Sequence, residues 1–411
     1  MDKSKVIFIC LLLTSLIIRL GLSLLPPFEI DQIGWRSWSL RMADLGPANF
    51  YSEQIFTDNP PGFLYVFWLI GFIKDTFFPN TTNLVFDFLL KLPTNIADIF
   101  SAVIIYNLIK RRLSERWALT GFTLYALNPA IIFNTSVWGQ FDGSATLFLL
   151  LALYTFFIKK SPPLTAFCFA IAWSIKPQAI AFVPPLALLF LSQTKGGTWI
   201  FSGITFLLTT LLLYLPFFPK DPISGIIQVQ KAMTGIFNCT TCFAFNFWGI
   251  FGNWQDDQKL FLGLTLMSWG IILLTLTLLP ILALRPFKLK FKQPFIYLTS
   301  ALSIYAFFLF VTRMHERYLF PFFGLFLLSA ILFRSKILLA FYFLVSLLHL
   351  INLYLPYAYY NKHLNLNQNL TEAILSNFKL LSAFSVILLI ILIGYFIKLQ
   401  YNIKKDEAPG S

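Results

Sequence analysis

The chain contains little charge. Asp, Glu, Lys and Arg make up only 12% of its 411 residues, against about 25% in soluble domains. This scarcity excludes an ordinary water-soluble enzyme. A small-residue cleavage site is also missing after the first apolar run, so we expect that run to remain as a membrane anchor rather than to leave as a signal peptide.

Cysteine is scarce as well, with four residues. Cys10 and Cys168 lie within apolar runs and are most simply packing residues. Cys239 and Cys242, in the tetrapeptide CTTC, can form a local disulfide in an oxidising compartment. A metal site would need further ligands, and none is spaced nearby. We therefore expect no metal and no other cofactor.

Long apolar runs take up most of the chain, which is 57% hydrophobic with a mean hydropathy of +0.73. Lipid-embedded helices need about 17 or more apolar residues. We predict an all-α polytopic membrane protein, a single transmembrane domain over residues 1–411. About twelve spans are expected, at 6–25, 89–109, 117–135, 143–158, 163–180, 181–194, 198–217, 260–283, 293–311, 319–333, 337–355 and 379–397. Arg19 and Asp98, inside the first two spans, are predicted to form a structural ion pair.

Basic residues sort to one side of these spans. With the N-terminus inside, the inner segments hold 18 of the 31 basic and four of the 18 acidic residues, which leaves a net charge of −1 elsewhere. The net charge of +13 is therefore an orientation signal rather than a surface for nucleic acid. Both termini, including the tail at 402–411, are predicted to be cytoplasmic. The long segments 26–88, 218–259 and 356–378 are then extracytoplasmic.

The first outer segment carries two predicted helices. Trp35, Trp38 and Met42 recur at helical spacing, which indicates an amphipathic helix whose indoles lie at the membrane interface. Asp31 stands at its start, and two roles are open to it: a cap of the helix N-terminus, or a general base at the rim of a cavity. The apolar stretch 60–72 is too short to span, so we expect an interfacial or re-entrant helix there.

Polar residues also stand where later spans reach the outer face. Gln140 and Asp142 lie in a very short turn, where Asp-Gly is also ordinary loop chemistry. Lys176 and Gln178 end a span. Because a lysine at mid-membrane costs about 2.5–3.5 kcal/mol on insertion scales, Lys176 either faces a cavity, as a phosphate ligand, or snorkels to the interface.

The densest charged cluster is VTRMHERYLFP, which brings together Arg313, His315, Glu316 and Arg317. Glu316 can simply neutralise an arginine. Alternatively, the planar guanidinium groups can hold phosphate oxygens, with the histidine as a further donor. Aromatic residues of the last two outer segments are open to two roles as well, an acceptor site or interfacial anchors: Trp248, Trp254, Tyr357, Tyr359, Tyr360 and His363.

Several blocks, taken together and in order, resemble a known family. They are the first outer segment, where Asp31 precedes Trp38 by seven residues and GPANFYS and TDNPPGFLYVFWLIG follow, then LLKLPTNIADIF, NPAIIFNTSVWGQFD, SIKPQ and MHERYLFP. They resemble the C-type integral membrane glycosyltransferases (GT-C fold), and within them the bacterial and archaeal mannosyltransferase-like group related to the enzymes of GPI-anchor and dolichol-linked glycan synthesis. The resemblance covers about residues 25–325.

The resemblance implies an inverting glycosyltransferase. It would move a hexose, with mannose expected, from a polyprenyl-phosphate sugar to a hydroxyl of a glycan, lipid or protein acceptor, on the outer face of a bacterial or archaeal plasma membrane. By resemblance, Asp31 is the catalytic base, and Lys176, His315 and Arg317 bind the donor phosphate without a metal. The other residues in matching motifs bind sugar or shape the pocket: Asp58, Gln140, Asp142, Gln178, Glu316 and Tyr318.

Two other functions stay open. A transporter or flippase of lipid-linked glycans also suits twelve spans, but it predicts repeated halves, which the sequence does not show. A metal-dependent oligosaccharide transferase with a pyrophosphate donor needs acids that bind a divalent ion. Asp256-Asp257 is the adjacent acidic pair on the outer side, and its position before a span indicates an exposed loop.

Overall fold

Helices make up nearly all of the regular structure in the computed structural model, which describes residues 3–52, 57, 59–283 and 292–406. Seven of the described helices are long and apolar enough to cross a membrane: Lys3–Leu22, Asn83–Lys110, Gly196–Tyr214, Leu266–Ala283, Gln293–Phe310, Lys336–Tyr360 and Phe378–Asn402. Shorter apolar helical segments cover Asp142–Phe157, Pro162–Ile175 and Pro177–Gln193. The predicted all-α polytopic membrane fold is confirmed, although seven helices of the described residues have spanning length where the sequence predicted about twelve spans, because several predicted spans form shorter helices.

The chain divides into two compact units. Unit 1 comprises Met1–Leu108, Ala118–Ile180 and Lys195–Phe237. All or most of the following elements belong to it: α1 (Lys3–Leu22), α2 (Glu29–Leu45), η1 (Pro47–Asn49), α3 (Pro61–Phe77), α4 (Asn83–Lys110), α5 (Glu115–Ala126), α6 (Pro129–Ile132), η2 (Phe133–Trp138), α7 (Asp142–Phe157), α8 (Pro162–Ile175), α10 (Gly196–Tyr214) and α11 (Pro222–Gly235). The turn η3 (Pro177–Phe182) holds the boundary at Ile180.

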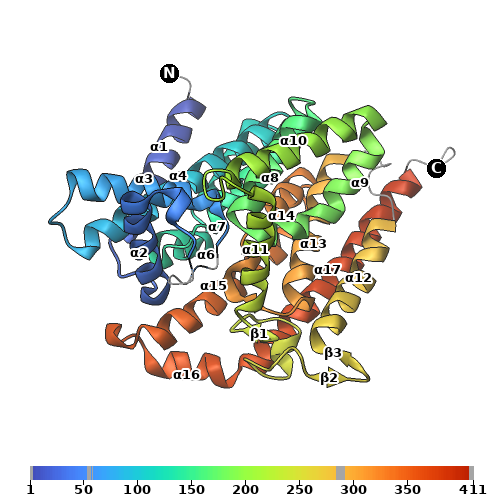
Figure 1. Cartoon of the computed structure of the whole chain (residues 1–411). Helices are drawn as coiled ribbons and strands as arrows, with labels where there is room; N and C mark the ends of the chain where they lie inside the picture. Colours follow the sequence, from blue (N-terminus) through green and yellow to red (C-terminus); the bar gives the residue numbers. More distant parts are fainter. Residues whose placement is uncertain (1–2, 53–56, 58, 284–291, 407–411) are drawn as a thin grey trace. The chain divides into compact units, whose positions relative to one another are not determined.

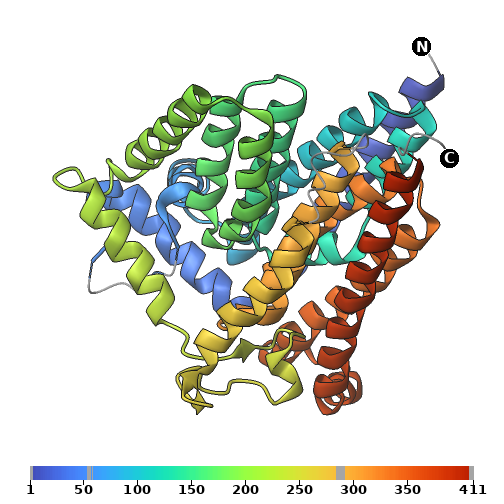
Figure 2. The same cartoon turned by 90° about the vertical axis from the view of Figure 1, so that its right-hand side faces the viewer.

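Unit 2 comprises Ile109–Trp117, Ala181–Thr194 and Asn238–Ser411. Its elements are α9 (Val183–Gln193), β1 (Thr241–Cys242), η4 (Trp248–Ile250), β2 (Leu260–Phe261), β3 (Leu264–Thr265), α12 (Leu266–Ala283), α13 (Lys292–Phe310), β4 (Met314–His315), η6 (Glu316–Leu319), α14 (Phe322–Leu332), α15 (Lys336–Tyr360), η7 (Lys362–Leu364), α16 (Gln368–Ser376) and α17 (Phe378–Asp406). Here α13 packs against α12, α14 and α17, and α15 packs against α14 and α16. Figure 2 shows the hairpin of β2 and β3 at the foot of α12.

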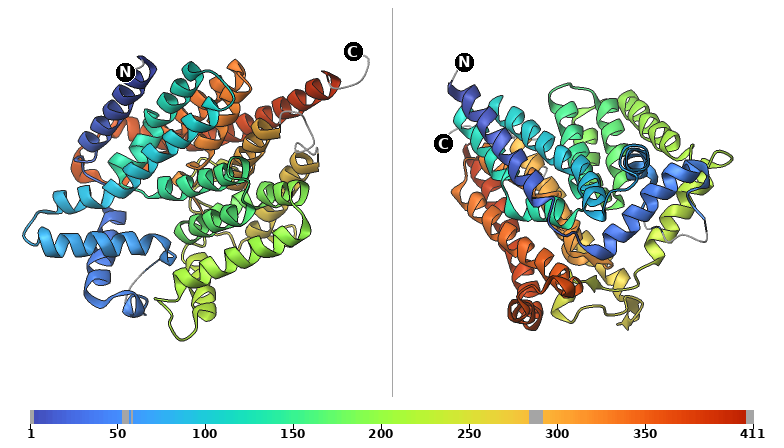
Figure 3. Two further views of the ribbon diagram at one scale, coloured as in Figure 1. Left: turned by 90° about the horizontal axis from the view of Figure 1, so that it is seen from above. Right: turned by 90° about the vertical axis from the view of Figure 1, so that its left-hand side faces the viewer.

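The two helices predicted in the first outer segment are both present, as α2 and α3, and lie side by side (Figure 3). The prediction that the indoles of Trp35 and Trp38 lie at an interface is wrong, because each residue is only 4% exposed and packs in a cluster with Phe67 and Phe141. The stripe faces α3 because the two helices approach closely: a Cβ at Gly71 would lie 2.0 Å from the carbonyl oxygen of Ser39.

Helices α7, α8 and α10 form the other packed group of unit 1, with α8 between its two neighbours (Figure 2). Helix α3 joins this group through α8, where a Cβ at Gly62 would lie 2.4 Å from the carbonyl oxygen of Ser174. Ser174 stands two residues before Lys176, so this close contact sets the position of the lysine at the end of α8.

Buried charges connect α1 to the rest of unit 1. The predicted ion pair is confirmed: Arg19 Nη1 donates to Asp98 Oδ2 at 2.8 Å, and both side chains are fully buried. Arg19 Nη2 also donates to the carbonyl oxygen of Ala126, at the end of α5. From α4, Lys91 Nζ donates to the carbonyl oxygens of Ser23 and Leu25, just beyond the end of α1. The ion pair therefore fastens α1 to both α4 and α5.

Substitution of Asp98 by Ala should destabilise the protein by about 3–5 kcal/mol, because Arg19 would stay buried without its carboxylate. Thermal unfolding in detergent micelles measures this loss. The control is Glu115→Ala, which removes the exposed pair of Lys110 and Glu115 and should cost at most about 1 kcal/mol. Equal losses in the two variants would contradict a structural role for the buried pair.

Candidate functional site

The carboxylate of Asp31 lies at the centre of a polar site in unit 1. Trp138 Nε1 donates to its Oδ2 at 2.9 Å, and Gln140 Nε2 donates to the same oxygen at 2.5 Å. Asp31 is half-buried, and among the described residues no donor reaches Oδ1. Oδ2 is therefore held in place, and Oδ1 is the oxygen that can accept a proton.

Asp31 does not cap its helix. The N-cap of α2 is Phe28, and Asp31 is the third residue of the helix. Its carboxylate instead binds residues more than 100 positions along the chain. The capping role left open by the sequence is therefore wrong, and the role of general base stays a prediction.

The donors to Asp31 come from an irregular connection between α5 and α7. Helix α5 ends before Asn128-Pro129, where the Asn128 side chain accepts from two backbone N–H groups and so caps α6. A π-helical turn follows over Phe133–Trp138 and ends at Gly139, which has φ +95°. Glycine is needed here because of that backbone angle and because a Cβ would lie 3.0 Å from Gln32 Oε1. This turn directs Trp138 and Gln140 at the carboxylate.

Lys176 extends the network from Asp31. Its Nζ donates to Gln140 Oε1 at 3.3 Å and lies 3.7 Å from Asp142 Oδ1. It also lies 4.0 Å from the centre of the Phe141 ring, a cation–π geometry. Lys176 is only 7% exposed, so its side chain is buried among these groups rather than extended to the surface. Its role as a phosphate ligand stays a prediction.

Asp142 completes this group, accepting from Asn134 Nδ2 at 3.4 Å. The structure thus brings Asp31, Gln140, Asp142 and Lys176 together. Gln178 lies in η3, and no described residue binds its buried Oε1. Asp58, predicted to bind sugar or shape the pocket, lies outside the described residues.

In unit 2 the charged cluster resolves into two ion pairs. The first joins Arg313 to Asp257: Nε donates to Oδ2 at 2.7 Å and Nη2 to Oδ1 at 3.2 Å. The prediction that Asp257 lies in an exposed loop is wrong, since its side chain is fully buried. A buried carboxylate needs such a partner, and Thr312 Oγ1 donates to it as well, at 3.0 Å.

The second pair joins neighbours in η6. Arg317 Nη1 donates to Glu316 Oε1 at 2.9 Å, and both side chains are largely buried. The Arg317 guanidinium also lies 5.5 Å from the centre of the Tyr318 ring, and the rings of His315 and Tyr318 are in contact. Glu316 therefore neutralises an arginine, one of the two roles that the sequence left open for it.

A short parallel pairing holds this cluster against the preceding outer segment. Strand β1 pairs with β4 in the register Thr241 to Met314 and Cys242 to His315. A disulfide joins Cys239 to Cys242, as the sequence suggested. The backbone N–H of Arg313 donates to the carbonyl oxygen of Cys239, so the disulfide and the first ion pair brace the same segment.

Some of the predicted aromatic residues line a pocket of about 460 Å³ in unit 2. Its walls are Phe243, Asn253, Trp254, Tyr359, Tyr360 and Leu375. The Asn253 side chain accepts from the backbone N–H of Phe243, and Lys362 lies over the Tyr359 ring at 5.6 Å. Trp254, Tyr359 and Tyr360 are thus grouped at one place, whereas Trp248 lines a different pocket.

Sequence reasoning missed three participants in the unit 1 site. Trp138 donates to Asp31, Asn134 donates to Asp142, and the Phe141 ring faces Lys176. All three lie in the block NPAIIFNTSVWGQFD, which the resemblance had singled out. A signal was available in the Gly139 that follows Trp138, since a glycine beside polar residues often marks an unusual backbone turn.

The fold and this site define a multi-pass helical membrane protein with a half-buried carboxylate fixed by a polar network. The family described as GPI transamidase subunit PIG-U matches residues 39–250, more than half of the chain, and the chain belongs to this family. No curated protein matches the chain. The predicted relation to proteins of the GPI pathway is confirmed at the level of this family, whose description is of a transamidase subunit and not of a glycosyltransferase.

The matched range covers some of the predicted site residues and not others. Gln140, Asp142 and Lys176 lie within residues 39–250, whereas Asp31 precedes that range and Arg317 follows it. The part shared with the family therefore contains the lysine and its polar partners, and the carboxylate predicted to act as the base lies outside it.

The ion pair of Asp257 predicts a pH dependence of stability. Burial by itself would raise the pKa of Asp257, but hydrogen bonds from Arg313, Gln258 and Thr312, with the charge of Arg313, bring that pKa below its ordinary value. The stabilisation is then present above the ordinary carboxyl pKa of about 3.9 and is lost as the pH falls through the lower folded-state pKa.

We expect the melting temperature of the wild type to fall as the medium is acidified through this range. Asp257→Asn should melt at a lower temperature at neutral pH, and its melting temperature should fall less on acidification. Thermal unfolding between neutral and acidic pH measures both. The control is Asp256→Asn, because the neighbouring Asp256 is exposed. If the melting temperatures of the wild type and of Asp257→Asn fell equally on acidification, this carboxylate would not be the cause of the pH dependence.

Proposed function

We propose that the protein is an inverting glycosyltransferase that moves a hexose from a polyprenyl-phosphate donor to an acceptor hydroxyl, on the extracytoplasmic face of a bacterial or archaeal plasma membrane. The observation that carries the proposal is the half-buried Asp31 carboxylate, held through Oδ2 by Trp138 and Gln140 and open at Oδ1 among the described residues. A general base needs this arrangement, because it must be fixed in position and still able to accept a proton.

In the proposed step, Asp31 Oδ1 takes the proton of the acceptor hydroxyl as the hydroxyl oxygen forms a bond to the anomeric carbon. The bond from that carbon to the phosphate oxygen breaks, and its electron pair leaves with the polyprenyl phosphate. A single displacement of this kind inverts the anomeric centre. The growing negative charge on the phosphate needs a preorganised cation in a site with little water.

Lys176 is the cation that the network around Asp31 includes among the described residues. It is buried, and its reach to Gln140 Oε1 connects it to the hydrogen bond that Gln140 gives to Asp31. The neighbouring Asp142 is 3.7 Å from Nζ, so the lysine is oriented before a ligand arrives. We propose Lys176 as a donor-phosphate ligand, with Asp142, Gln178 and Asp58 as residues that bind sugar or shape the pocket.

His315 and Arg317 keep their proposed role as further phosphate ligands in unit 2, with Tyr318 and Glu316 shaping the pocket. The support is the contact of the Arg317 guanidinium with the Tyr318 ring and of that ring with His315. Arg317 Nη1 donates to Glu316 Oε1 at 2.9 Å, which fixes the position of the guanidinium.

A second candidate is a non-catalytic subunit that binds a glycolipid. The family match favours it, because the family is described as a transamidase subunit and the matched range leaves out Asp31. In that case Lys176 and its partners would hold a phosphate and no bond would be made or broken at Asp31.

Asp31→Asn should lower sugar transfer by about 10²–10⁴-fold, the usual contribution of a general base, while binding of the donor is kept. The measurement is transfer from synthetic polyprenyl-phosphate mannose by purified protein, with donor affinity determined in parallel. Asp44→Asn is the matched control, since Asp44 is an exposed residue of the same helix and should leave transfer unchanged.

Full turnover by Asp31→Asn would rule out the carboxylate as the base. Absence of any transfer by the wild type, with donor binding intact, would instead favour the non-catalytic subunit. Activity that is lost on chelation with EDTA and restored by magnesium or manganese would favour the metal-dependent transferase.

Lys176→Gln should weaken binding of polyprenyl phosphate by about tenfold or more, because a hydrogen bond to a charged group is lost. Arg317→Ala should weaken it as well. Competition against a labelled donor measures both. Lys195→Gln is the control, since this lysine is exposed in the same unit as Lys176, and unchanged affinity in Lys176→Gln would reduce the buried lysine to a structural role.

A further inference from the structure

A second pocket of unit 2 lies between η4, the hairpin of β2 and β3, and the start of α12. It has a volume of about 460 Å³, within the roughly 300–1,000 Å³ of typical ligand pockets. Its walls are Thr240, Phe247, Trp248, Phe251, Gln255, Lys259, Phe261, Leu266, Trp269 and Leu273. None of these residues belongs to the site proposed for sugar transfer.

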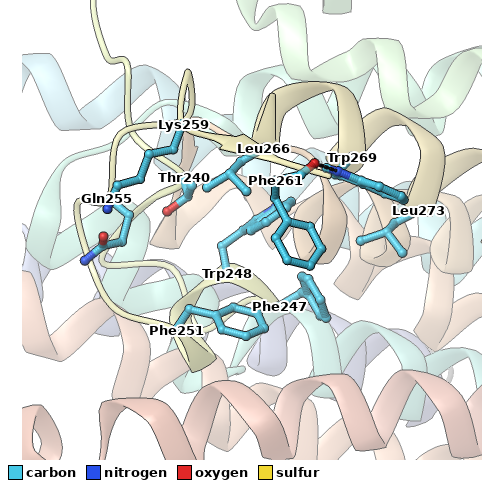
Figure 4. Close-up of a pocket in the computed structure, with 10 residues that line it drawn as sticks. All are labelled: Thr240, Phe247, Trp248, Phe251, Gln255, Lys259, Phe261, Leu266, Trp269 and Leu273. Atoms are coloured by element: carbon cyan, nitrogen blue, oxygen red, sulfur yellow. Dashed lines mark hydrogen bonds between the residues drawn. The ribbon is translucent and has the colours of Figure 1, made fainter. Parts of the chain in front are cut away.

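The pocket has an apolar part and a polar end (Figure 4). The rings of Phe247, Trp248, Phe251 and Phe261 gather on one side with Leu273, whereas Thr240, Gln255 and Lys259 lie together on the other. A ligand that suits such a pocket has an apolar chain and a polar head.

One wall of the pocket belongs to a membrane span. Leu266, Trp269 and Leu273 follow the spacing of one face of α12, which is among the helices long and apolar enough to cross a membrane. Trp269 Nε1 donates to the carbonyl oxygen of Phe261 at 2.8 Å and so ties the hairpin to the helix. A pocket built on the end of a span is within reach of the acyl chains of the bilayer.

The hairpin exposes apolar side chains beside the pocket. Leu260, Phe261 and Leu262 are 72%, 58% and 78% exposed. Three consecutive large apolar side chains at a strand turn would be unfavourable in water, and contiguous exposed patches of this kind mark contact with a partner or a membrane. The hairpin therefore indicates that the surroundings of the pocket are lipid.

The polar end carries a positive charge. Lys259 is exposed and is the charged residue among the described residues that line the pocket. Of the nearby acidic residues in the sequence, Asp257 is paired with Arg313, and the exposed Asp256 does not line the pocket. Thr240 and Gln255 add neutral hydrogen-bonding groups. The head of the ligand is then an anion that can also accept hydrogen bonds, which describes a phosphate.

We infer that this pocket binds an anionic phospholipid of the surrounding bilayer, with one acyl chain in the aromatic part and the phosphate at Lys259. The inference does not rest on the proposed transferase function. A bound lipid would hold the hairpin and η4 against α12 in the way that the disulfide holds the segment before them.

Native mass spectrometry of the purified full chain in detergent, titrated with phosphatidylglycerol or phosphatidylcholine of matched acyl chains, tests the inference. We expect tighter binding of phosphatidylglycerol. Lys259→Gln should lower that affinity by about fivefold, the effect of one basic residue near an anionic headgroup. Leu273→Trp should fill the pocket and lower the binding of both lipids.

Two controls match these variants. Lys362→Gln removes an exposed lysine of the same unit that does not line this pocket, and Leu276→Trp enlarges a residue of α12 that is 61% exposed and lies outside it. Both should bind phosphatidylglycerol like the wild type. Equal affinity of the wild type for the two lipids, or unchanged affinity in Lys259→Gln, would overturn the headgroup assignment. Displacement by inorganic phosphate alone would overturn the role of the acyl chain.

Discussion

A charge within a lipid-embedded bundle has to be met by the protein itself, because hydrocarbon offers no water to solvate it. In unit 1 this constraint organises the helices around Arg19, which reaches Asp98 of α4 and the carbonyl oxygen of Ala126 at the end of α5. From Ala126 the chain enters the Asn128-Pro129 break and the π-helical turn that ends at Gly139. Trp138 and Gln140, which donate to Asp31, lie at the end of that turn. The position of the carboxylate site therefore depends on the ion pair of Arg19 and Asp98.

Unit 2 meets the same constraint with two ion pairs. Arg313 is engaged by the buried Asp257, and Arg317 by Glu316, while the disulfide and the pairing of β1 with β4 hold the chain between them. An arginine in an ion pair binds a ligand less readily, because the ligand must compete with the carboxylate that is already in place. In unit 1, Lys176 Nζ lies 3.7 Å from Asp142 Oδ1 and donates to the neutral amide oxygen of Gln140.

The family relation and the carboxylate site bear on function in different ways. The match to the PIG-U family covers the lysine, the amide and the second acid of the unit 1 site but stops short of Asp31. A site of this kind can hold a phosphate without the carboxylate, whereas proton abstraction needs it. The family match therefore bears on Lys176 and its partners, and the proposed transfer depends on Asp31.

The sequence by itself determined the membrane class, the approximate places of the helices and the pairing of Arg19 with Asp98, because hydropathy and charge act over one helix length at a time. It also singled out Asp31, Gln140, Asp142 and Lys176, but not Trp138, Asn134 and Phe141, which contact them. Only the tertiary structure decided that Trp35 and Trp38 face a core rather than an interface, that Asp31 binds Trp138 and Gln140 rather than capping its own helix, and that Asp257 is buried against Arg313. The partners in these last two contacts lie more than 50 residues apart. Local periodicity shows which face of a helix is apolar but not what that face meets, which follows from packing of the whole unit.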